Sequence, residues 1–227
     1  MFDVPEILVG FDIESTGLDT NYDEAISYGF AEFRAGHLVR TEQFFVLPDV
    51  QIHPGAERVH GISFEVLRKL HREGGALSAR AGASRATQRL MDYASAGASF
   101  VGANPMFDYS MLNSTLRRQG VGDLETFGLR LDELLIIDVV AHDKAIDDDR
   151  VARPRRGLAN LCEFYDVTSG AHDAAEDARA AGEVLVAQIR RVNRQLTVSP
   201  VSTSEVEVSH SCASTASWFK RAIFGSR

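Results

Sequence analysis

Residues 6–17 read EILVGFDIESTG, an apolar run that ends in two acids and a glycine. Residues 6–13 form a short stretch, rich in β-branched side chains and followed by Gly17, which is typical of a buried strand. Asp12 and Glu14 stand two residues apart, so the period of a strand places both carboxylates on one face. Adjacent carboxylates repel each other, and a hard cation such as Mg²⁺ relieves that repulsion. The stretch predicts a strand that ends either in a metal site or in two solvent-facing acids.

Four further stretches have the composition of strands. Two of them flank Ala35-Gly36, a dipeptide that suits a tight hairpin turn, and they extend the first strand into a group of three antiparallel neighbours. The other two lie farther along the chain, after helical patterns. The five predicted strands are Glu6 to Ile13, Ala25 to Phe33, His37 to Val46, Ser99 to Ala103 and Leu134 to Val140.

Helical patterns lie between and after these strands. The longest, from Asp173 to Leu196, repeats apolar residues at steps of three and four and predicts an amphipathic helix. Pro48 and Pro54 instead mark a loop. Shorter helices are predicted over residues 63–70, 84–93, 106–118 and 158–165. Three hairpin-like strands followed by alternating helices and strands predict an α/β fold, a mixed five-stranded sheet flanked by helices.

Length and composition limit the classes of protein to which the chain can belong. With 227 residues, 44% hydrophobic and 25% charged, the chain is expected to be an ordinary globular protein, which excludes collagen-like, fully disordered and disulfide-dense classes. The 32 acids exceed the 24 basic residues and give a net charge of −8, which disfavours a protein that coats DNA irrespective of sequence. The two cysteines form no zinc or disulfide pattern. Neither a membrane span nor a signal peptide is predicted, so the expected location is cytoplasmic, with no membrane partner.

The composition changes near the end of the chain. Residues 197–227 contain 11 Ser or Thr among 31 residues and lack an apolar period, which predicts a disordered tail after a folded domain over residues 1–196. The tail closes with an apolar group, Trp218, Phe219, Ile223 and Phe224. This group is expected either to dock as a short helix in the groove of a partner or to remain unanchored.

Two further polar motifs lie at predicted element ends. Asn104 follows the fourth strand, and Asp108 falls in the first turn of the helix after it. His172 comes just before the last helix, and Asp177 lies about one turn inside it among alanines. Alone, each acid is explained by a favourable interaction with the helix dipole. Together with Asp12, they occupy the strand and helix ends at which α/β proteins build their clefts.

In these three motifs the sequence resembles the DEDDh (DnaQ-like) group of 3′→5′ exonucleases, which includes the proofreading epsilon subunit of bacterial DNA polymerase III. The motifs of the group are Asp-x-Glu followed by Thr-Gly, an Asn followed by Phe-Asp, and a His five residues before an Asp. They correspond here to residues 12–17, to Asn104 with Phe107-Asp108, and to His172 with Asp177. The sequence VHGI at residues 59–62 is a smaller similarity. The resemblance covers about residues 6–195 and implies a ribonuclease H-like exonuclease domain.

The resemblance also implies a two-metal hydrolysis of a phosphodiester bond. Two Mg²⁺ or Mn²⁺ ions about 3.5–4 Å apart would activate the attacking water and stabilise the leaving 3′ oxygen. The metal ligands that it implies are Asp12, Glu14, Asp108 and Asp177. His172 would be the general base that deprotonates the water, a role that suits an imidazole. The implied substrate-binding residues are Thr16, Gly17, Leu18, His60, Asn104 and Phe107.

The implied substrate is a nucleic acid 3′ end, from which nucleoside monophosphates would be released. Single-stranded or frayed DNA is favoured, and an oligoribonuclease-like exoribonuclease is the alternative, since residues 12–19 fit that group as well. A non-catalytic nucleic-acid-binding relative is disfavoured by the complete set of four acids and one histidine. A phosphatase whose first motif is Asp-x-Asp-x-Thr is disfavoured because Glu14 stands at its second acid. A polymerase or a repair protein would be the partner of the tail.

Overall fold

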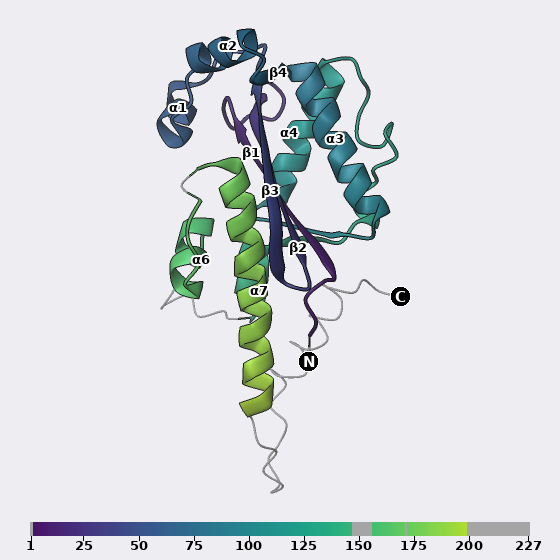
Figure 1. Ribbon diagram of the computed structural model, residues 1–227, viewed down its shortest axis with the longest axis vertical. Helices are drawn as coiled ribbons and strands as arrows, with labels where there is room; N and C mark the ends of the chain where they lie inside the picture. The colour runs from purple at the N-terminus through teal and green to yellow at the C-terminus, as the bar shows by residue number, and fades with distance from the viewer. Residues whose placement is uncertain (1, 147–155, 171, 199–227) are drawn as a thin grey trace, which may run out of the picture.

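The computed structural model describes residues 2–146, 156–170 and 172–198 (Figure 1). The division into an exonuclease domain over residues 1–196 and a tail over residues 197–227 stays a prediction, because residues 199–227, including the apolar group at the end, lie outside these ranges. Among the described residues, no helix combines the length and the apolar character needed to cross a membrane.

In the part of the chain that the structure describes, six strands form one mixed sheet in the order β4-β3-β2-β1-β5-β6. β1, β2 and β3 are antiparallel neighbours, whereas β5 and β6 run parallel to β1, and β4 runs parallel to β3. The strands are β1 (Ile7–Ser15), β2 (Ala25–Arg34), β3 (His37–Leu47), β4 (Ala76–Ser78), β5 (Ser99–Gly102) and β6 (Ile136–Asp138). The structure confirms the predicted mixed α/β sheet, and its described residues contain six strands where five were predicted.

The added strand, β4, lacks a local sequence pattern that would predict it, whereas the predicted hairpin has one. β4 has three residues and pairs with residues 45–47 of β3. Three residues are too few for an alternating pattern, and the pair Gly74-Gly75 just before them is typical of a loop. In the hairpin, by contrast, Ala35 and Gly36 have φ values of 47° and 77°, and a two-residue type I′ turn requires positive φ at both positions.

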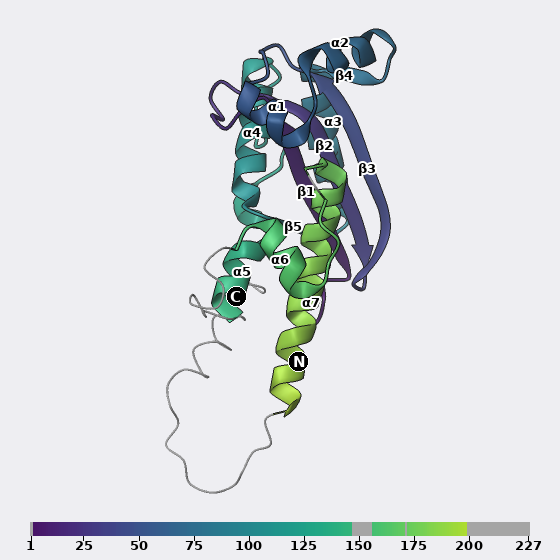
Figure 2. The ribbon, with the colours of Figure 1, turned by 90° about the vertical axis from the view of Figure 1, so that its left-hand side faces the viewer.

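Helices cover both faces of the sheet (Figures 1 and 2). α3 and α4 pack on one face, and α7 lies along the other with α6 beside it. α1 and α2 lie at the end of the sheet where β1 finishes. The helices are α1 (Pro54–His60), α2 (Phe64–Arg72), α3 (Ala79–Ser95), α4 (Pro105–Arg118), α5 (Val139–Ile146), α6 (Leu158–Tyr165) and α7 (Ala174–Val198), with a 3₁₀ turn, η1, at Leu131–Glu133.

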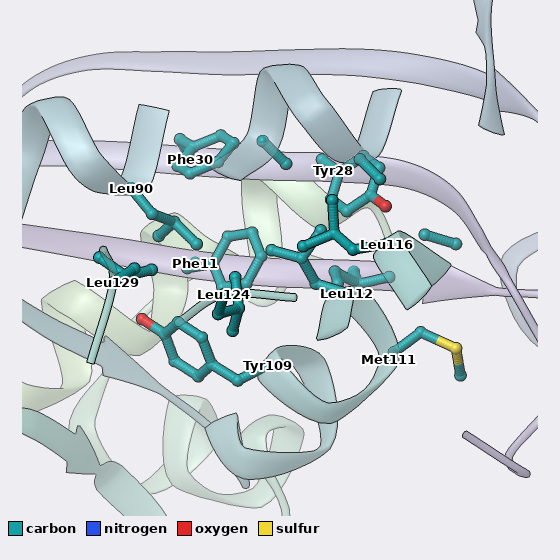
Figure 3. Packing of buried hydrophobic residues seen from close by; sticks show 14 of the residues in the cluster. Phe11, Tyr28, Phe30, Leu90, Tyr109, Met111, Leu112, Leu116, Leu124 and Leu129 are labelled. Atoms are coloured by element: carbon teal, nitrogen blue, oxygen red, sulfur yellow. The ribbon is translucent and has the colours of Figure 1, made fainter. Parts of the chain in front are cut away.

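Strand β1 is buried on both faces, and its alternation divides its side chains between them. Phe11 packs beneath α3 and α4 in the largest apolar cluster, together with Ile7, Val9 and Ile13 of the same strand; Figure 3 shows part of this cluster. The ring centroids of Phe11 and Tyr109 lie 5.3 Å apart in this cluster, a favourable separation for an aromatic pair. Leu8 packs on the opposite face, beneath α7. Asp12 and Glu14 share the parity of Leu8, so β1 directs both acids to the α7 side.

Two elements differ from the expectation for local reasons. Helix α1 begins at Pro54, where a loop was predicted. Proline suits the first helical position, and the His53 ring caps the helix by accepting a hydrogen bond from the Gly55 N–H. The apolar run predicted as one strand over residues 134–140 is divided between β6 and α5, which begins at Val139. A short apolar run fits a buried strand and a buried helix equally well.

Candidate active site

The acids of the first motif lie where three parallel strands end. Because β1, β5 and β6 run in the same direction, their carboxyl ends meet at one edge of the sheet. Asp12 and Glu14 lie near the end of β1, Asn104 follows β5, and Asp138 ends β6. The Asp138 carboxylate joins two of these ends, since its Oδ1 accepts from the Asn104 N–H at 3.2 Å and from the Val140 N–H at 2.9 Å. Open α/β sheets bind ligands at such an edge.

Two glycines let the first turns of α7 lie directly on the centre of the sheet. A Cβ on Gly10 would be 2.1 Å from the Ala178 carbonyl oxygen, and a Cβ on Gly29 would meet the α7 backbone equally closely. Gly29 pairs with Asp12 in the antiparallel ladder, so the helix contacts the sheet beside this acid. The absence of a side chain at both positions is what brings Asp177 of α7 to the acids of β1.

Asp108 reaches the same region from helix α4. Asn104 adopts the left-handed conformation, with φ 61° and ψ 49°, where the chain turns from β5 into the helix. Asparagine tolerates this conformation better than most residues do. Pro105 then occupies the first helical position, and Asp108 lies in the first turn with 4% of its surface exposed. A carboxylate there interacts favourably with the helix dipole.

The third motif completes the group. His172 precedes α7 with a positive φ of 64° and is exposed to solvent. Its ring, the Glu14 carboxylate and the Asp177 carboxylate each offer one ligand atom, and these three atoms all lie within 4.8 Å of one another. The fold therefore places ligand atoms of the first and third motifs close enough together to coordinate one ion.

Burial and mutual repulsion raise the pKa values of the four acids. Burial raises the pKa of Glu14 to about 8, with further increases from Asp177 and Asp173. Burial also raises the pKa of Asp108 against the opposing effect of backbone amides, and that of Asp177 against the opposing charge of His172. The pKa of Asp12 lies well above its ordinary value because its carboxyl is removed from solvent and lies near other acids. In decreasing order of effect these are Asp108, Asp177, Glu14 and Asp173.

The donor set suits a hard divalent cation. Carboxylate oxygens are the ligands that Mg²⁺ and Mn²⁺ prefer, and an imidazole is compatible with either ion. A bound cation would reverse the electrostatic balance of the site and lower the raised pKa values. The residues present at this edge therefore fit the predicted metal site.

Asp173 belongs to the acidic group, although no motif pointed to it. Its Oδ1 accepts from the Glu176 N–H at 3.1 Å and so caps the start of α7. The Gln43 amide of β3 faces the same carboxylate, at 2.8 and 3.0 Å with its nitrogen turned toward the two oxygens. The sequence signal for Asp173 was its place at a helix start, which explains the cap but not the proximity to the other acids.

A pocket of about 550 Å³ opens beside the acids. Three segments line it: the end of β1, the loop that joins β1 to β2, and α1 with the residue before it. Gly17, Leu18 and His60, three of the predicted substrate-binding residues, lie in this lining. His53 and Asp23 also line the pocket, although neither belongs to one of the three motifs.

The other three predicted substrate-binding residues lie outside the pocket lining. Thr16 is fully buried, and its hydroxyl donates to Asp23 Oδ1 at 2.8 Å and accepts from the Glu24 N–H at 3.0 Å. Thr16 therefore shapes the loop from inside. Asn104 is exposed at the start of α4, and Phe107 packs against the α3/α4 core.

His60 borders the pocket as the last residue of α1. Its Nδ1 accepts from the Ile62 N–H at 3.1 Å. Burial lowers the pKa of His60, the Ser15 backbone and Glu57 oppose this effect, and His172 adds to it. The balance of these effects lowers the pKa of His60 and so favours its neutral imidazole beside the pocket.

A family model and a curated relative match this chain in sequence. The model of the RNase_T family, described as Exonuclease, matches residues 9–185. The DNA polymerase III PolC-type of Caldanaerobacter subterraneus subsp. tengcongensis is 24% identical over 185 residues, which are 81% of this chain and 12% of the polymerase.

Solved structures of exonuclease I share the fold. E. coli exonuclease I in complex with a 5cy-dT13 oligonucleotide matches with a TM-score of 0.67 and 17% identity, over 85% of this chain and 42% of the other. The zinc-bound E. coli exonuclease I–single-stranded DNA complex matches with a TM-score of 0.65 and 19% identity, over the same shares. This chain spans less than half the length of either exonuclease I chain. The match confirms the ribonuclease H-like fold that the motifs implied.

The match to the family model bears out the resemblance drawn from the three motifs. It runs from β1 into α7 and so includes every acid of the group described above. The chain belongs to the RNase_T exonuclease family.

Proposed function

We propose that this chain is a metal-dependent 3′→5′ exonuclease of the DEDDh type that acts on single-stranded or frayed DNA 3′ ends. The observation that carries the proposal is the convergence of Glu14, His172 and Asp177 at one sheet edge. Asp12 and Asp108 lie beside them, near enough for the charges of the group to raise the pKa of Asp12. Such a concentration of acids is unfavourable by itself and becomes favourable around divalent cations.

The four acids would hold two Mg²⁺ or Mn²⁺ ions, which when bound supply a nucleophilic water and neutralise the scissile phosphate. Three rigid features fix the four ligands. Strand β1 fixes Asp12 and Glu14, the first turn of α4 fixes Asp108, and the close contact of α7 with the sheet fixes Asp177. The zinc-bound exonuclease I structure supports a metal site in a related fold.

His172 would accept the proton of the attacking water. Its ring lies at the edge of the acidic group, within 4.8 Å of ligand atoms of Glu14 and Asp177. Because it is exposed, it can pass the proton to bulk solvent after each cycle.

The terminal nucleotide would occupy the pocket beside the acids. A volume of about 550 Å³ lies within the range of small-molecule sites, and Gly17, Leu18 and His60 line it. The exonuclease I complexes contain single-stranded DNA or oligodeoxynucleotides, and the polymerase relative is a DNA polymerase, which together favour DNA over RNA. The polymerase relative also supports a place in DNA replication or repair, as a proofreading activity beside a polymerase.

A gel time course tests the proposal. The full chain would meet 5′-labelled single-stranded DNA or RNA of one sequence with Mg²⁺, Mn²⁺ or EDTA, beside Asp12→Asn and the control Asp92→Asn, which changes an exposed acid of α3. A descending ladder that needs both a metal and Asp12 is expected, with DNA the faster substrate. Faster cleavage of RNA would favour the exoribonuclease alternative. No cleavage of either substrate would contradict the proposal in favour of a non-catalytic relative.

A further inference from the structure

We propose that Arg118, at the end of α4, is a positioning residue that holds one wall of the substrate pocket. The inference rests on the proposed function and adds a residue that none of the three motifs contains. It begins with the loop over residues 16–24, which joins β1 to β2. Four residues of this loop line the pocket: Gly17, Leu18, Asp19 and Asp23.

The loop does not hold itself in place by burying its large side chains. Leu18 is 86% exposed and Tyr22 is 74% exposed. Its internal support comes from the Asp23 carboxylate, which accepts from the Thr16 hydroxyl and from the Asp19 N–H, both at 2.8 Å. These bonds shape the loop, but they do not attach its outer part to the rest of the domain.

The Arg118 guanidinium supplies that attachment. Its Nη1 donates to the Thr20 carbonyl at 3.2 Å and to the Asn21 carbonyl at 2.8 Å, and its Nη2 donates to the Asp23 carbonyl. Its Nε lies 3.6 Å from Glu24 Oε1, so one side chain contacts the backbone of three loop residues and the carboxylate of a fourth.

The carboxylate that faces Arg118 is itself well anchored. Glu24 is 2% exposed, and its Oε2 accepts from the Asp49 N–H at 2.7 Å. Only 27% of the Arg118 side chain is exposed. Partial burial strengthens these contacts relative to an ion pair in open solvent. The planar guanidinium of arginine spreads five donors over three nitrogens in a fixed geometry, whereas lysine carries its three donors on a single nitrogen and cannot span acceptors so far apart.

The position of Arg118 on α4 links this wall to the acidic group. Asp108 lies in the first turn of the same helix, and ten residues, about 15 Å of helix, separate the two. One rigid helix therefore sets an acid at one end and the pocket wall at the other. Loss of Arg118 releases the wall and leaves Asp108 in place, so substrate binding is affected and the chemical step is not.

The test compares Arg118→Ala and Arg118→Lys with Arg117→Ala in the full chain. Arg117 is the matched control because it is the neighbouring arginine, is more exposed and pairs with Asp123 outside the pocket. KM and kcat are measured on a 5′-labelled oligodeoxynucleotide with Mg²⁺. We expect Arg118→Ala to raise KM by about 10- to 100-fold, with kcat within about threefold of the wild type. Arg118→Lys should raise KM by a smaller factor than Arg118→Ala does, and Arg117→Ala should have the KM of the wild type.

Two further measurements keep the outcomes distinct. Thermal unfolding checks that each variant folds, and hydrogen exchange reports directly on the amides of residues 17–24. An unchanged KM in Arg118→Ala, or an equal rise in Arg117→Ala, would overturn the inference. So would a loss of thermal stability without faster exchange in the loop. If the wild type cleaves nothing, the proposed function fails, and faster loop exchange in Arg118→Ala but not Arg117→Ala still supports the role of Arg118.

Discussion

Four carboxylates from three elements share one sheet edge, although each would be better solvated apart. They are Asp12, Glu14, Asp108 and Asp177. The fold holds them there because the apolar packing of β1, α4 and α7 outweighs the repulsion, so the site is a locally unfavourable region in a well-packed molecule. Neutral substitutions of these acids should therefore reduce activity without reducing the stability of the metal-free protein.

Replacing Asp12 with asparagine should abolish metal-dependent cleavage without unfolding the chain. The amide keeps the size of the side chain, removes one charge from the acidic group and provides a poorer metal ligand. The Tm of the metal-free variant should equal or exceed that of the wild type, with about 2–4 °C for each kcal/mol of repulsion relieved. Cleavage on a gel and thermal unfolding in EDTA measure the two effects. Retained cleavage would refute the assignment of Asp12 as a ligand.

Glu14 should make the stability of the metal-free protein depend on pH. Burial raises its pKa from 4.5 to about 8, so the folded state favours the protonated form. Its contribution to stability is therefore fully present below about pH 4.5 and is lost as the pH rises toward 8. Glu14→Gln stays neutral, so its Tm relative to the wild type in EDTA should increase between pH 5 and pH 8. An effect of order 1–3 kcal/mol is expected after solvent screening. A difference that stays constant with pH would contradict this prediction.

At the scale of the elements, the contact between β1 and α7 determines whether the first and third motifs meet. Gly10→Ala should displace α7, because the new Cβ would lie 2.1 Å from the Ala178 carbonyl oxygen. Overpacking of this kind costs about 1–3 kcal/mol, and cleavage should fall because Asp177 moves with the helix. Gly75→Ala is the control, since its nearest neighbouring atom would lie at an ordinary 3.4 Å. Thermal unfolding and cleavage assays check both variants, and a Gly10→Ala protein with wild-type behaviour would show that α7 does not depend on this approach.

At the scale of the whole molecule, metal binding should couple to stability. Ions that bind only the folded acidic group stabilise it by about 2.7 kcal/mol at one hundred times their Kd. That corresponds to a rise in Tm of roughly 5–10 °C for a chain of this length. Thermal unfolding with increasing Mg²⁺ or Mn²⁺ measures the shift, which Asp12→Asn should reduce. If the Tm does not change at metal concentrations that support cleavage, the fold does not assemble the acidic group before the metal binds.

How much of the molecule the sequence predicts depends on how local each signal is. The hairpin at Ala35-Gly36 and the strand that carries Asp12 have signals within a few residues, and both were predicted. Helix α1 also has a local signal, in Pro54 at its first position, but proline was interpreted as the mark of a loop. Strand β4 has no local signal, because its pairing with β3 is a tertiary contact.

The same distinction applies to the site. The motifs pointed to acids at element ends, and the structure places these acids together. The sequence does not single out Arg118 or Asp173, because an arginine at the end of a helix and an aspartate at the start of one have ordinary local explanations. Their proximity to the pocket and to the acids follows from how α4 and α7 pack, which a motif does not encode.

The alternation of β1 has a consequence for folding fidelity. A slip of this strand by one residue would turn Asp12 and Glu14 into the aromatic cluster beneath α3 and turn Phe11 toward α7, where Gly10 now admits the helix backbone. Such a misfolded molecule would bury charge and lose its largest core contacts at the same time. Only the register that completes the core also brings the acids together. A correctly folded molecule therefore has an assembled acidic group as a direct result of folding.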